Sequence, residues 1–453
     1  MSNHTRLVLA KKISAWSILL IVWTACQPTS DKSINQSDEI LIGTLRRVSQ
    51  VPYVFEPHIA VNPMNSNHIA AVVISIPEFE CALDLQCRGK LLLYTSKDSG
   101  VTWVEQIPFE RSEISGDGVV AFGPDGMLYL TGLGSNTVMT VRADTEGKMT
   151  LSNTSLIATG QTDKPWLTIE PQDGTLYVTY NGATEDKNDA VLLSKSIDKG
   201  QTWDEPVIVD AGVSISALES GQANPQFGAQ VMLGRGDNLA VAWAWAPGFD
   251  TLPKGVWVAT SNDRGQTFSK ARQIAETWGI ISTAFHGSDY YIFYRKGTEQ
   301  SQELVVAIFR DEGQTWTTSS VSGELPLYFD VDKAPGVNVA PNGTIDVVFY
   351  AHGVGAPGCI DIAAFLNRWK QGWIDQCVYD VYYTFSKDDG QTFHAPIKLN
   401  DTPIVGARFV QTRGISRPGE YMGMASTGKY AYPIWIDTQG TEGTQAYTVQ
   451  INR

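Results

Sequence analysis

One short motif occurs five times in this sequence and constrains the fold more than any other feature. The pattern is Ser-x-Asp-x-Gly-x-Thr followed by Trp or Phe, with Phe replacing Ser in one copy, and it occupies residues 96–103, 196–203, 261–268, 309–316 and 386–393. The Asp carboxylate can accept backbone N–H groups inside a tight turn, the Gly can adopt a positive φ, and the Thr and aromatic residue open the next strand. The motif therefore predicts a β-hairpin turn in each of five repeated units.

These motifs resemble the Asp boxes of sialidase-like (BNR-repeat) β-propellers, and the resemblance extends over nearly the whole chain after residue 39. It implies an all-β fold of four-stranded blades, in which each box joins the third strand to the fourth. It also implies a structural role, remote from any chemistry, for the five box aspartates: Asp98, Asp198, Asp263, Asp311 and Asp388.

The spacing of the boxes predicts the number of blades. Successive box aspartates are 100, 65, 48 and 77 residues apart, and strand-like segments at 119–122, 127–130 and 137–141 indicate a blade without a good box in the widest interval. Residues 421–451 supply three more strands, and 40–45 together with Arg46 and Arg47 can provide the outer strand that closes the ring. We predict seven blades; six, the number in family sialidases, with a terminal embellishment is the alternative.

The N-terminal segment has the features of an export signal. Three basic residues precede an apolar run from 13 to 25, which is shorter than the roughly 20 residues of a membrane span. The run ends in Trp23-Thr24-Ala25-Cys26, which resembles a bacterial lipobox. We predict a lipoprotein-type signal peptide over 1–26 with Cys26 lipidated, a polar tether over 27–39 and one propeller domain over 40–453. Plain secretion with cleavage nearby is the alternative.

An export signal of this kind predicts a protein that lies outside the cytoplasm. We expect a lipoprotein held at the outer membrane or cell surface through its N-terminal lipid alone, or a periplasmic protein, and in either case a monomer. Four further cysteines, an even number in an exported chain, favour two local disulfides, Cys81 with Cys87 and Cys359 with Cys377, although three pairings exist.

The charge of the chain excludes one class of partner. There are 34 Lys and Arg against 48 Asp and Glu, a net charge of −14, and cleavage before Cys26 would leave −17. Nucleic-acid binding needs a basic face, which this chain lacks, so we expect no nucleic acid as a partner. No cofactor is expected to be required; Ca²⁺ is a candidate because Asp and carbonyl oxygens suit it, but no EF-hand spacing locates a metal site.

The long irregular segments predict which face of the ring carries function. In a four-stranded blade, the 2–3 turns and the connections between blades lie on the face opposite the boxes, and the longest segments, including 76–89 and 351–378, fall there. We expect ligand at the channel mouth on that face. Acid–base or nucleophile candidates at this mouth are Asp117, Asp163, Glu420 and Tyr421. Substrate-binding candidates are Glu56, His58, Lys164, Trp166, Trp245, Arg295, His352, Arg408 and Arg413.

The resemblance implies sialidase chemistry, with three arginines on the substrate carboxylate, a Tyr nucleophile activated by a Glu and an Asp acid/base. The chain departs from this pattern, because its first inner strand reads Phe55-Glu-Pro-His-Ile where the family has Phe-Arg-Ile-Pro. Three functions stay open: a sialidase-type exo-glycoside hydrolase, a non-catalytic propeller that binds a glycan or a surface protein, and a polysaccharide lyase that uses His and Tyr. The acid-rich mouth is poorly suited to an anionic sugar.

Overall fold

The structure is a computed structural model of the chain. It describes residues 40–75, 89–106, 116–143, 148–186, 188–214, 226–245, 255–277, 279–298, 301–310, 315–325, 327, 334–352, 378–405, 411–412, 415–416, 419–439 and 443–453. The chain divides into two compact units, Met1–Glu39 and Ile40–Arg453, and everything described belongs to the second. These residues contain strands, turns and loops, and no helix among them could span a membrane.

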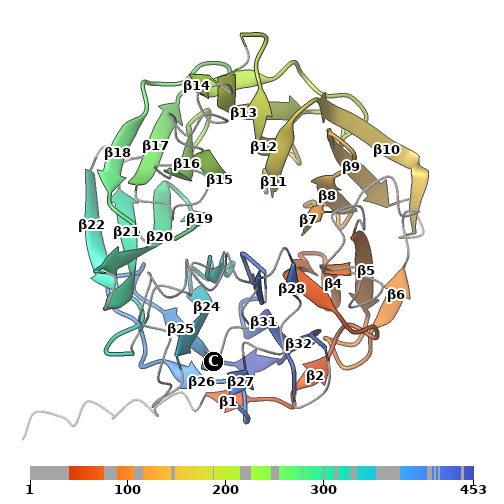
Figure 1. Ribbon diagram of the computed structural model, residues 1–453, viewed down its shortest axis with the longest axis vertical. Coiled ribbons are helices and arrows are strands. Elements are labelled where there is room, and N and C mark those ends of the chain that lie inside the picture. Colours follow the sequence, from red (N-terminus) through yellow and green to blue (C-terminus); the bar gives the residue numbers. More distant parts are fainter. Residues whose placement is uncertain are drawn as a thin grey trace, which may run out of the picture. The chain divides into compact units, whose positions relative to one another are not determined.

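Seven antiparallel sheets follow one another around a ring in the Ile40–Arg453 unit (Figure 1). The first six are ordered from the innermost strand outward as the chain runs, so each is a blade. Blade 1 consists of β3 (Val54–Asn62), β4 (Asn65–Ser75), β5 (Lys90–Ser96) and β6 (Val104–Gln106). Blade 2 consists of β7 (Gly116–Phe122), β8 (Leu128–Leu133), β9 (Thr137–Ala143) and β10 (Met149–Thr159). Blade 3 consists of β11 (Thr162–Ile169), β12 (Leu176–Ala183), β13 (Asn188–Ser196) and β14 (Val207–Ser214). The prediction of a blade without a good box, blade 2, is confirmed.

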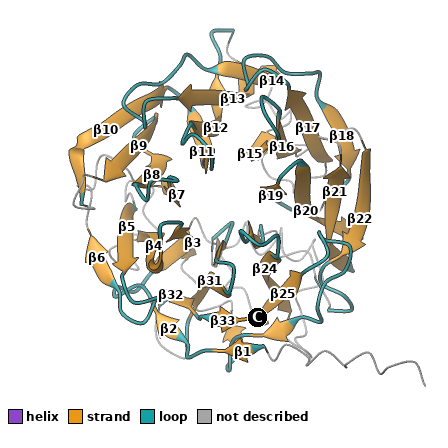
Figure 2. Cartoon of the chain, turned by 180° about the vertical axis from the view of Figure 1, so that it is seen from behind, coloured by secondary structure: helices purple, strands orange, loops and turns teal. Residues whose placement is uncertain are grey.

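Blades 4 to 6 repeat this order, as the reverse view in Figure 2 also shows. Blade 4 consists of β15 (Gln226–Leu233), β16 (Leu239–Trp245), β17 (Gly255–Ser261) and β18 (Arg272–Ala275). Blade 5 consists of β19 (Ser282–His286), β20 (Asp289–Gly297), β21 (Gln302–Arg310) and β22 (Thr315–Ser320). Blade 6 consists of β23 (Gly336–Val339), β24 (Ile345–His352), β25 (Val378–Ser386) and β26 (Ile397–Lys398), and β27 (Ile404–Val405) also pairs with β25. A two-stranded hairpin, β28 (Gln411–Thr412) with β29 (Ile415–Ser416), precedes the seventh blade.

Both ends of the unit build blade 7. The C-terminal part contributes β30 (Gly423–Ser426), β31 (Tyr430–Asp437), β32 (Gln445–Thr448) and β33 (Ile451–Asn452). From the other end, β2 (Arg46–Arg47) pairs with β32 and β1 (Leu41–Ile42) pairs with β33. The seven-blade prediction and closure by the N-terminal segment are thus confirmed, and the six-blade alternative is wrong.

The core lies between the blades, because the middle strands are buried on both faces. In β4 every residue from Ile69 to Ser75 is buried, and β12 is buried from Leu176 to Gly182. Six hydrophobic clusters fill the spaces between neighbouring blades, with large aromatic side chains such as Trp243 and Trp435 fully buried in them. This packing leaves the ends of the inner strands to carry polar residues.

The box motifs form self-contained turns. Asp98 accepts hydrogen bonds from the N–H of Thr102 (2.9 Å) and its hydroxyl (2.6 Å), and Ser96 Oγ donates to Asp98 and accepts the N–H of Gly100, whose φ is 83°. The Thr102 bonds come first among the causes that lower the pKa of Asp98 to about 2. The turns at Asp198, Asp263 and Asp388 have the same pattern, whereas that at Asp311 lies outside the described residues.

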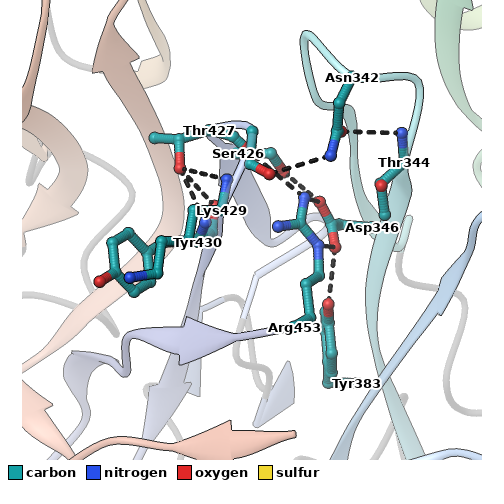
Figure 3. A network of polar contacts seen from close by, with 10 residues as sticks. Asn342, Thr344, Asp346, Tyr383, Ser426, Thr427, Lys429, Tyr430 and Arg453 are labelled. Atoms are coloured by element: carbon teal, nitrogen blue, oxygen red, sulfur yellow. Dashed lines mark hydrogen bonds and ion pairs between the residues drawn. The ribbon is translucent and has the colours of Figure 1, made fainter. Parts of the chain in front are cut away.

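A buried ion pair ties blade 6 to the last residue of the chain, near the turn that begins β24 (Figure 3). The guanidinium of Arg453 donates to both carboxylate oxygens of Asp346, at 2.6 and 2.5 Å. Tyr383 and Ser426 also donate to this carboxylate, each at 2.6 Å. The side chains of Arg453 and Asp346 are 1% and 0% exposed, so this buried network joins blade 6 to blade 7.

Candidate functional site

The inner strands of blades 1, 2 and 3 share a β-bulge close to their first residue. The pairing register shifts between Phe55 and His58, between Gly116 and Val119, and between Asp163 and Trp166. Within each bulge one residue has a left-handed backbone: Glu56 (φ 52°), Asp117 (φ 46°) and Lys164 (φ 49°). Bulges of this kind usually place Gly at the left-handed position, as blade 4 does with Gly228 (φ 59°).

Charged residues at these positions carry backbone strain, which in proteins concentrates at functional sites. Because the three bulges occupy equivalent places in adjacent blades, they direct Glu56, Asp117 and Lys164 toward one region. The contacts between β3 and β7 and between β7 and β11 bring these strand ends together.

Lys164 is the centre of the resulting cluster. Its Nζ lies 2.6 Å from Oε2 of Glu420 and 3.3 Å from Oδ1 of Asp117. Glu420 comes from the segment just before β30, and its N–H donates to Glu56 Oε1 at 3.3 Å. Gly419 permits this approach, since its φ is +103° and a Cβ there would lie 2.4 Å from Cγ of Glu56. Blades 1, 2 and 3 and the entry to blade 7 therefore meet at one site, which we call the acidic cluster: Glu56, Asp117, Asp163, Lys164 and Glu420.

The carboxyl groups of the acidic cluster hold protons unequally. Burial raises the pKa of Glu56 well above its usual value. The pKa of Asp163 is raised to about 7, first by burial and then by the neighbouring Asp117 and Glu420, against the opposing charge of Lys164. For Asp117, burial is outweighed by Lys164 and by hydrogen bonds with Glu56 and Asp163, so its pKa is lowered. The site therefore holds protonated and ionised carboxyl groups together at neutral pH.

Exposure distinguishes these groups further. Glu56 and Asp117 are each only 7% exposed, whereas Asp163 is solvent-exposed and the side chain of Glu420 is 30% exposed. Asp163 and Glu420 are the two carboxyl groups of the cluster that a substrate can reach.

Three aromatic rings line the cluster. Trp166 lies edge-to-face with His58 on one side (5.4 Å between ring centroids) and with Tyr421 on the other (6.0 Å). Burial lowers the pKa of His58 to about 4 and raises that of Tyr421 well above its usual value, so both are neutral near pH 7. Tyr421 is 7% exposed, and its hydroxyl has no hydrogen-bond partner among the described residues.

The structure thus brings together all four residues predicted for acid–base or nucleophilic roles, with four of the predicted substrate-binding residues. Trp245, Arg295 and His352 lie elsewhere on the ring, at or near the ends of the second strands of blades 4, 5 and 6. Predictions for Arg408, Arg413, the lipidation site Cys26 and the cysteines Cys81, Cys87, Cys359 and Cys377 fall outside the described residues. Within the described ranges, no group of three or more His, Cys, Asp or Glu side chains is arranged to hold a metal ion.

Sequence reasoning missed the bulges and the role of Gly419. The sequence did contain a signal for the bulges. When the sequences of the four inner strands are aligned, Gly228 of blade 4 takes the same position as Glu56, Asp117 and Lys164 of blades 1 to 3, and a glycine at that position indicates a left-handed backbone.

Solved structures with this architecture include enzymes that act on glycans. The polysaccharide lyase Uly1 is 8% identical with a TM-score of 0.54, over 91% of this chain and 99% of that one. An ulvan lyase bound to -[GlcA(1-4)Rha3S]- is 10% identical with a TM-score of 0.52, over 88% and 95%. The endosialidase of phage phi92 is 9% identical with a TM-score of 0.51, over 90% and 69%. At such identities these likenesses establish the fold alone; no protein-family model and no curated protein matches the sequence.

Proposed function

We propose that this protein is a glycan-cleaving enzyme, a glycoside hydrolase whose general acid is Asp163. One observation carries the proposal: Asp163, an accessible carboxyl group whose pKa is raised to about 7, shares the acidic cluster with Asp117, whose carboxylate lies 3.3 Å from Lys164 Nζ and whose pKa is lowered. Glycosidases use this division between a protonated and an ionised carboxyl group.

In the proposed reaction, Asp163 donates its proton to the glycosidic oxygen as the bond from that oxygen to the anomeric carbon breaks. As that bond breaks, Glu420, the other accessible carboxylate, takes a proton from a water molecule whose oxygen bonds to the anomeric carbon. If Glu420 instead bonds to the anomeric carbon itself, a second step follows, in which Asp163 takes a proton from water, the water oxygen replaces Glu420 on that carbon, and both residues return to their starting state. Lys164 holds Glu420 at 2.6 Å and stabilises its charge. The ring of Trp166 offers an apolar surface beside these groups for a sugar face.

The described groups do not favour a sialidase mechanism. A Tyr nucleophile needs an ionised Glu as its base, but the pKa values of Tyr421 and Glu56 are both raised. The candidates for a carboxylate clamp on the predicted functional face are Arg88, Arg295, Arg408, Arg413 and Arg417. Of these five arginines, Arg295 lies in the described part of the chain and the other four lie outside it. Since four carboxyl groups surround one lysine, we propose an uncharged sugar as substrate.

A polysaccharide lyase is the second candidate, favoured by the row of His58, Trp166 and Tyr421. A neutral histidine and a tyrosine hydroxyl without an internal partner are groups that can move a proton next to a uronate carboxylate. Lys164 would then face that carboxylate, although it is already paired with Asp117 and Glu420. The fold shared with two lyases is compatible with this candidate.

We also propose that the protein reaches its substrate as an exported lipoprotein, anchored through Cys26, with the polar segment 27–39 as its tether. Metabolic labelling with a palmitate analogue tests this part, because Cys26→Ser should abolish the label. If the unmodified protein took up no label, the lipoprotein proposal would be refuted, and the enzymatic proposal would stand unaffected.

The enzymatic proposal is tested by incubating residues 27–453 with arabinan, xylan, ulvan and sialyllactose. The hydrolase predicts new reducing ends from an uncharged polymer, without ultraviolet-absorbing product. Unsaturated, ultraviolet-absorbing ends from ulvan would indicate the lyase, and free sialic acid the sialidase. Binding of a polymer without cleavage would overturn all three and leave a binding protein.

A further inference from the structure

Asn181 is a buried amide that the protein itself does not satisfy. It lies in β12, directly across from Asp163 of β11, and is 3% exposed. Neither Oδ1 nor Nδ2 has a hydrogen-bond partner among the described residues. Burying an unpaired amide costs free energy, so a site that keeps one needs a reason other than stability.

The equivalent positions in neighbouring blades show that the fold does not need an amide here. Asn181 faces the residue that precedes the left-handed position of blade 3. In blades 1, 2 and 4 the residue in that place is apolar: Ile74 opposite Phe55, Leu133 opposite Gly116, and Ala244 opposite Phe227. Blade 3 therefore differs from the others at the point where it approaches Asp163.

The side chain of Asn181 is on the side of blade 4. Thr179, two residues earlier and hence on the same face of β12, donates its hydroxyl proton to the carbonyl of Ala229 in β15 at 2.5 Å. Strands β12 and β15 contact one another and, as the second strand of blade 3 and the first strand of blade 4, run in opposite directions. Since Thr179 bonds to Ala229, Asn181 therefore lies level with Gln226 to Gly228.

A second unsatisfied amide lies at this level. Gln226 is 8% exposed, and its Oε1 has no partner among the described residues, while its Nε2 donates to Asp210 at 2.7 Å. Beside it, blade 4 has Gly228 at the left-handed position that carries Glu56, Asp117 or Lys164 in the preceding blades, and a Cβ there would lie 3.3 Å from Ile280. The boundary between blades 3 and 4 thus carries uncharged hydrogen-bonding groups in place of the charged groups of the acidic cluster.

We infer that Asn181 and Gln226 form a sugar-binding subsite on the blade 4 side of Asp163. This inference rests on the proposed action on glycans at the acidic cluster. A primary amide both donates and accepts, as a sugar hydroxyl does, so the two match without charge. The subsite orients one sugar ring so that its glycosidic oxygen faces Asp163.

The test separates binding from turnover. Variants are made in an Asp163→Asn background, which the proposed mechanism makes inactive, and are run in native gels containing arabinan, xylan or ulvan, where retardation measures affinity. Asn181→Leu installs the side chain that blade 2 has at this place. Thr179→Val is the matched control, because it alters the same face of the same strand two residues further from the mouth. Thermal unfolding is measured on each variant without polymer.

We expect at least one polymer to retard the background protein and Asn181→Leu to weaken that affinity about tenfold or more, without loss of thermal stability. Thr179→Val should lower stability and leave affinity unchanged. Retardation by no polymer, or equal retardation of Asn181→Leu, would overturn the inference and assign the amide to an internal water. Retardation without cleavage of the same polymer by the unmodified protein would refute the proposed hydrolase but keep the subsite.

Discussion

Polar groups find their hydrogen-bond partners in opposite ways at the box turns and at the acidic cluster. At the box turns, Ser96, Asp98 and Thr102 satisfy one another within eight residues, and the pKa of the aspartate falls to about 2. At the acidic cluster, the pKa of Asp163 rises to about 7, and the hydroxyl of Tyr421 lacks an internal partner. The box turns are therefore satisfied internally, whereas the acidic cluster keeps polar groups without an internal partner, as expected of the proposed ligand site.

The largest expected effect is on turnover at the acidic cluster. Asp163→Asn removes the proposed proton donor but keeps the shape of the side chain, so kcat on the cleaved polymer should fall about 10²- to 10⁴-fold. The free energy of unfolding should change little near pH 4, where the carboxyl group of Asp163 is protonated in the folded protein, and should rise toward pH 7, where its ionisation opposes folding. Asp198→Asn, on a box turn, is the control and should leave kcat intact. Equal kcat for Asp163→Asn and the unmodified protein would remove Asp163 from the mechanism.

The next effect is on stability away from the acidic cluster. Arg453→Met leaves the carboxylate of Asp346 buried without its cation, and breaking such a pair typically costs about 3–5 kcal/mol. Urea unfolding at pH 7 measures the loss. Burial already raises the pKa of Asp346, so the loss should shrink at lower pH as this carboxyl group is protonated. A loss independent of pH would mean that packing, and not charge, accounts for the effect.

A smaller loss of stability is expected at the box turns. Asp98→Ala removes a carboxylate that accepts from Ser96 and Thr102, which should cost about 1–2 kcal/mol in urea unfolding. Affinity for any glycan should not change, because the turn lies opposite the mouth. A large loss of affinity with the fold intact would contradict the assignment of faces.

The finest distinction between the box turns and the acidic cluster is the sign of their pH dependence. Asp98 has a folded pKa of about 2, below its unfolded value near 4, so its contribution to stability is present above pH 4 and lost as pH falls toward 2. Asp163 has a folded pKa of about 7, above its unfolded value, so stability falls as pH rises from 4 to 7 and its ionisation opposes folding above that.

Melting temperatures of the unmodified protein, Asp98→Asn and Asp163→Asn across pH 2 to 8 check both signs. In Asp98→Asn, the fall in melting temperature between pH 4 and pH 2 should be smaller than in the unmodified protein. In Asp163→Asn, the fall between pH 4 and pH 7 should be smaller. The same titration predicts that turnover declines as pH rises above about 7, when Asp163 loses its proton. If both variants reduced the fall over the same pH range, the contrast between the box turns and the acidic cluster would be refuted.

Much of the fold was predictable because it follows from local chemistry. Each box motif contains all the groups of its own turn, and the strands on either side are apolar runs, so seven blades could be counted from the sequence. The site was predictable only in part. Strand ends predicted Glu56, Asp117, Asp163, Lys164 and Glu420 at the mouth, but the bulges that direct Glu56, Asp117 and Lys164 toward one region depend on pairing with a second strand.

The protonation of the site was beyond sequence reasoning for a related reason. The pKa of Asp163 depends on burial and on Asp117, Lys164 and Glu420, which come from three separate parts of the chain. Asn181 shows the same limit, because its amide is unusual only by comparison with Ile74, Leu133 and Ala244 in the paired strands.

The closure of blade 7 has a consequence for how the protein is made. Its outer strand, Arg46–Arg47, pairs with Tyr447–Thr448, about 400 residues later in the chain. In each of the other blades, all the paired strands come from one short stretch of chain. During synthesis six blades can form in order, but the first and last must keep exposed edges until the final strand emerges. Closing so long a loop is slow, and ring closure is therefore expected to be the last folding step. Since Leu41 and Asn452 then lie side by side, a chain that joins these two ends and starts between two blades should build the same ring with every blade formed from one continuous stretch.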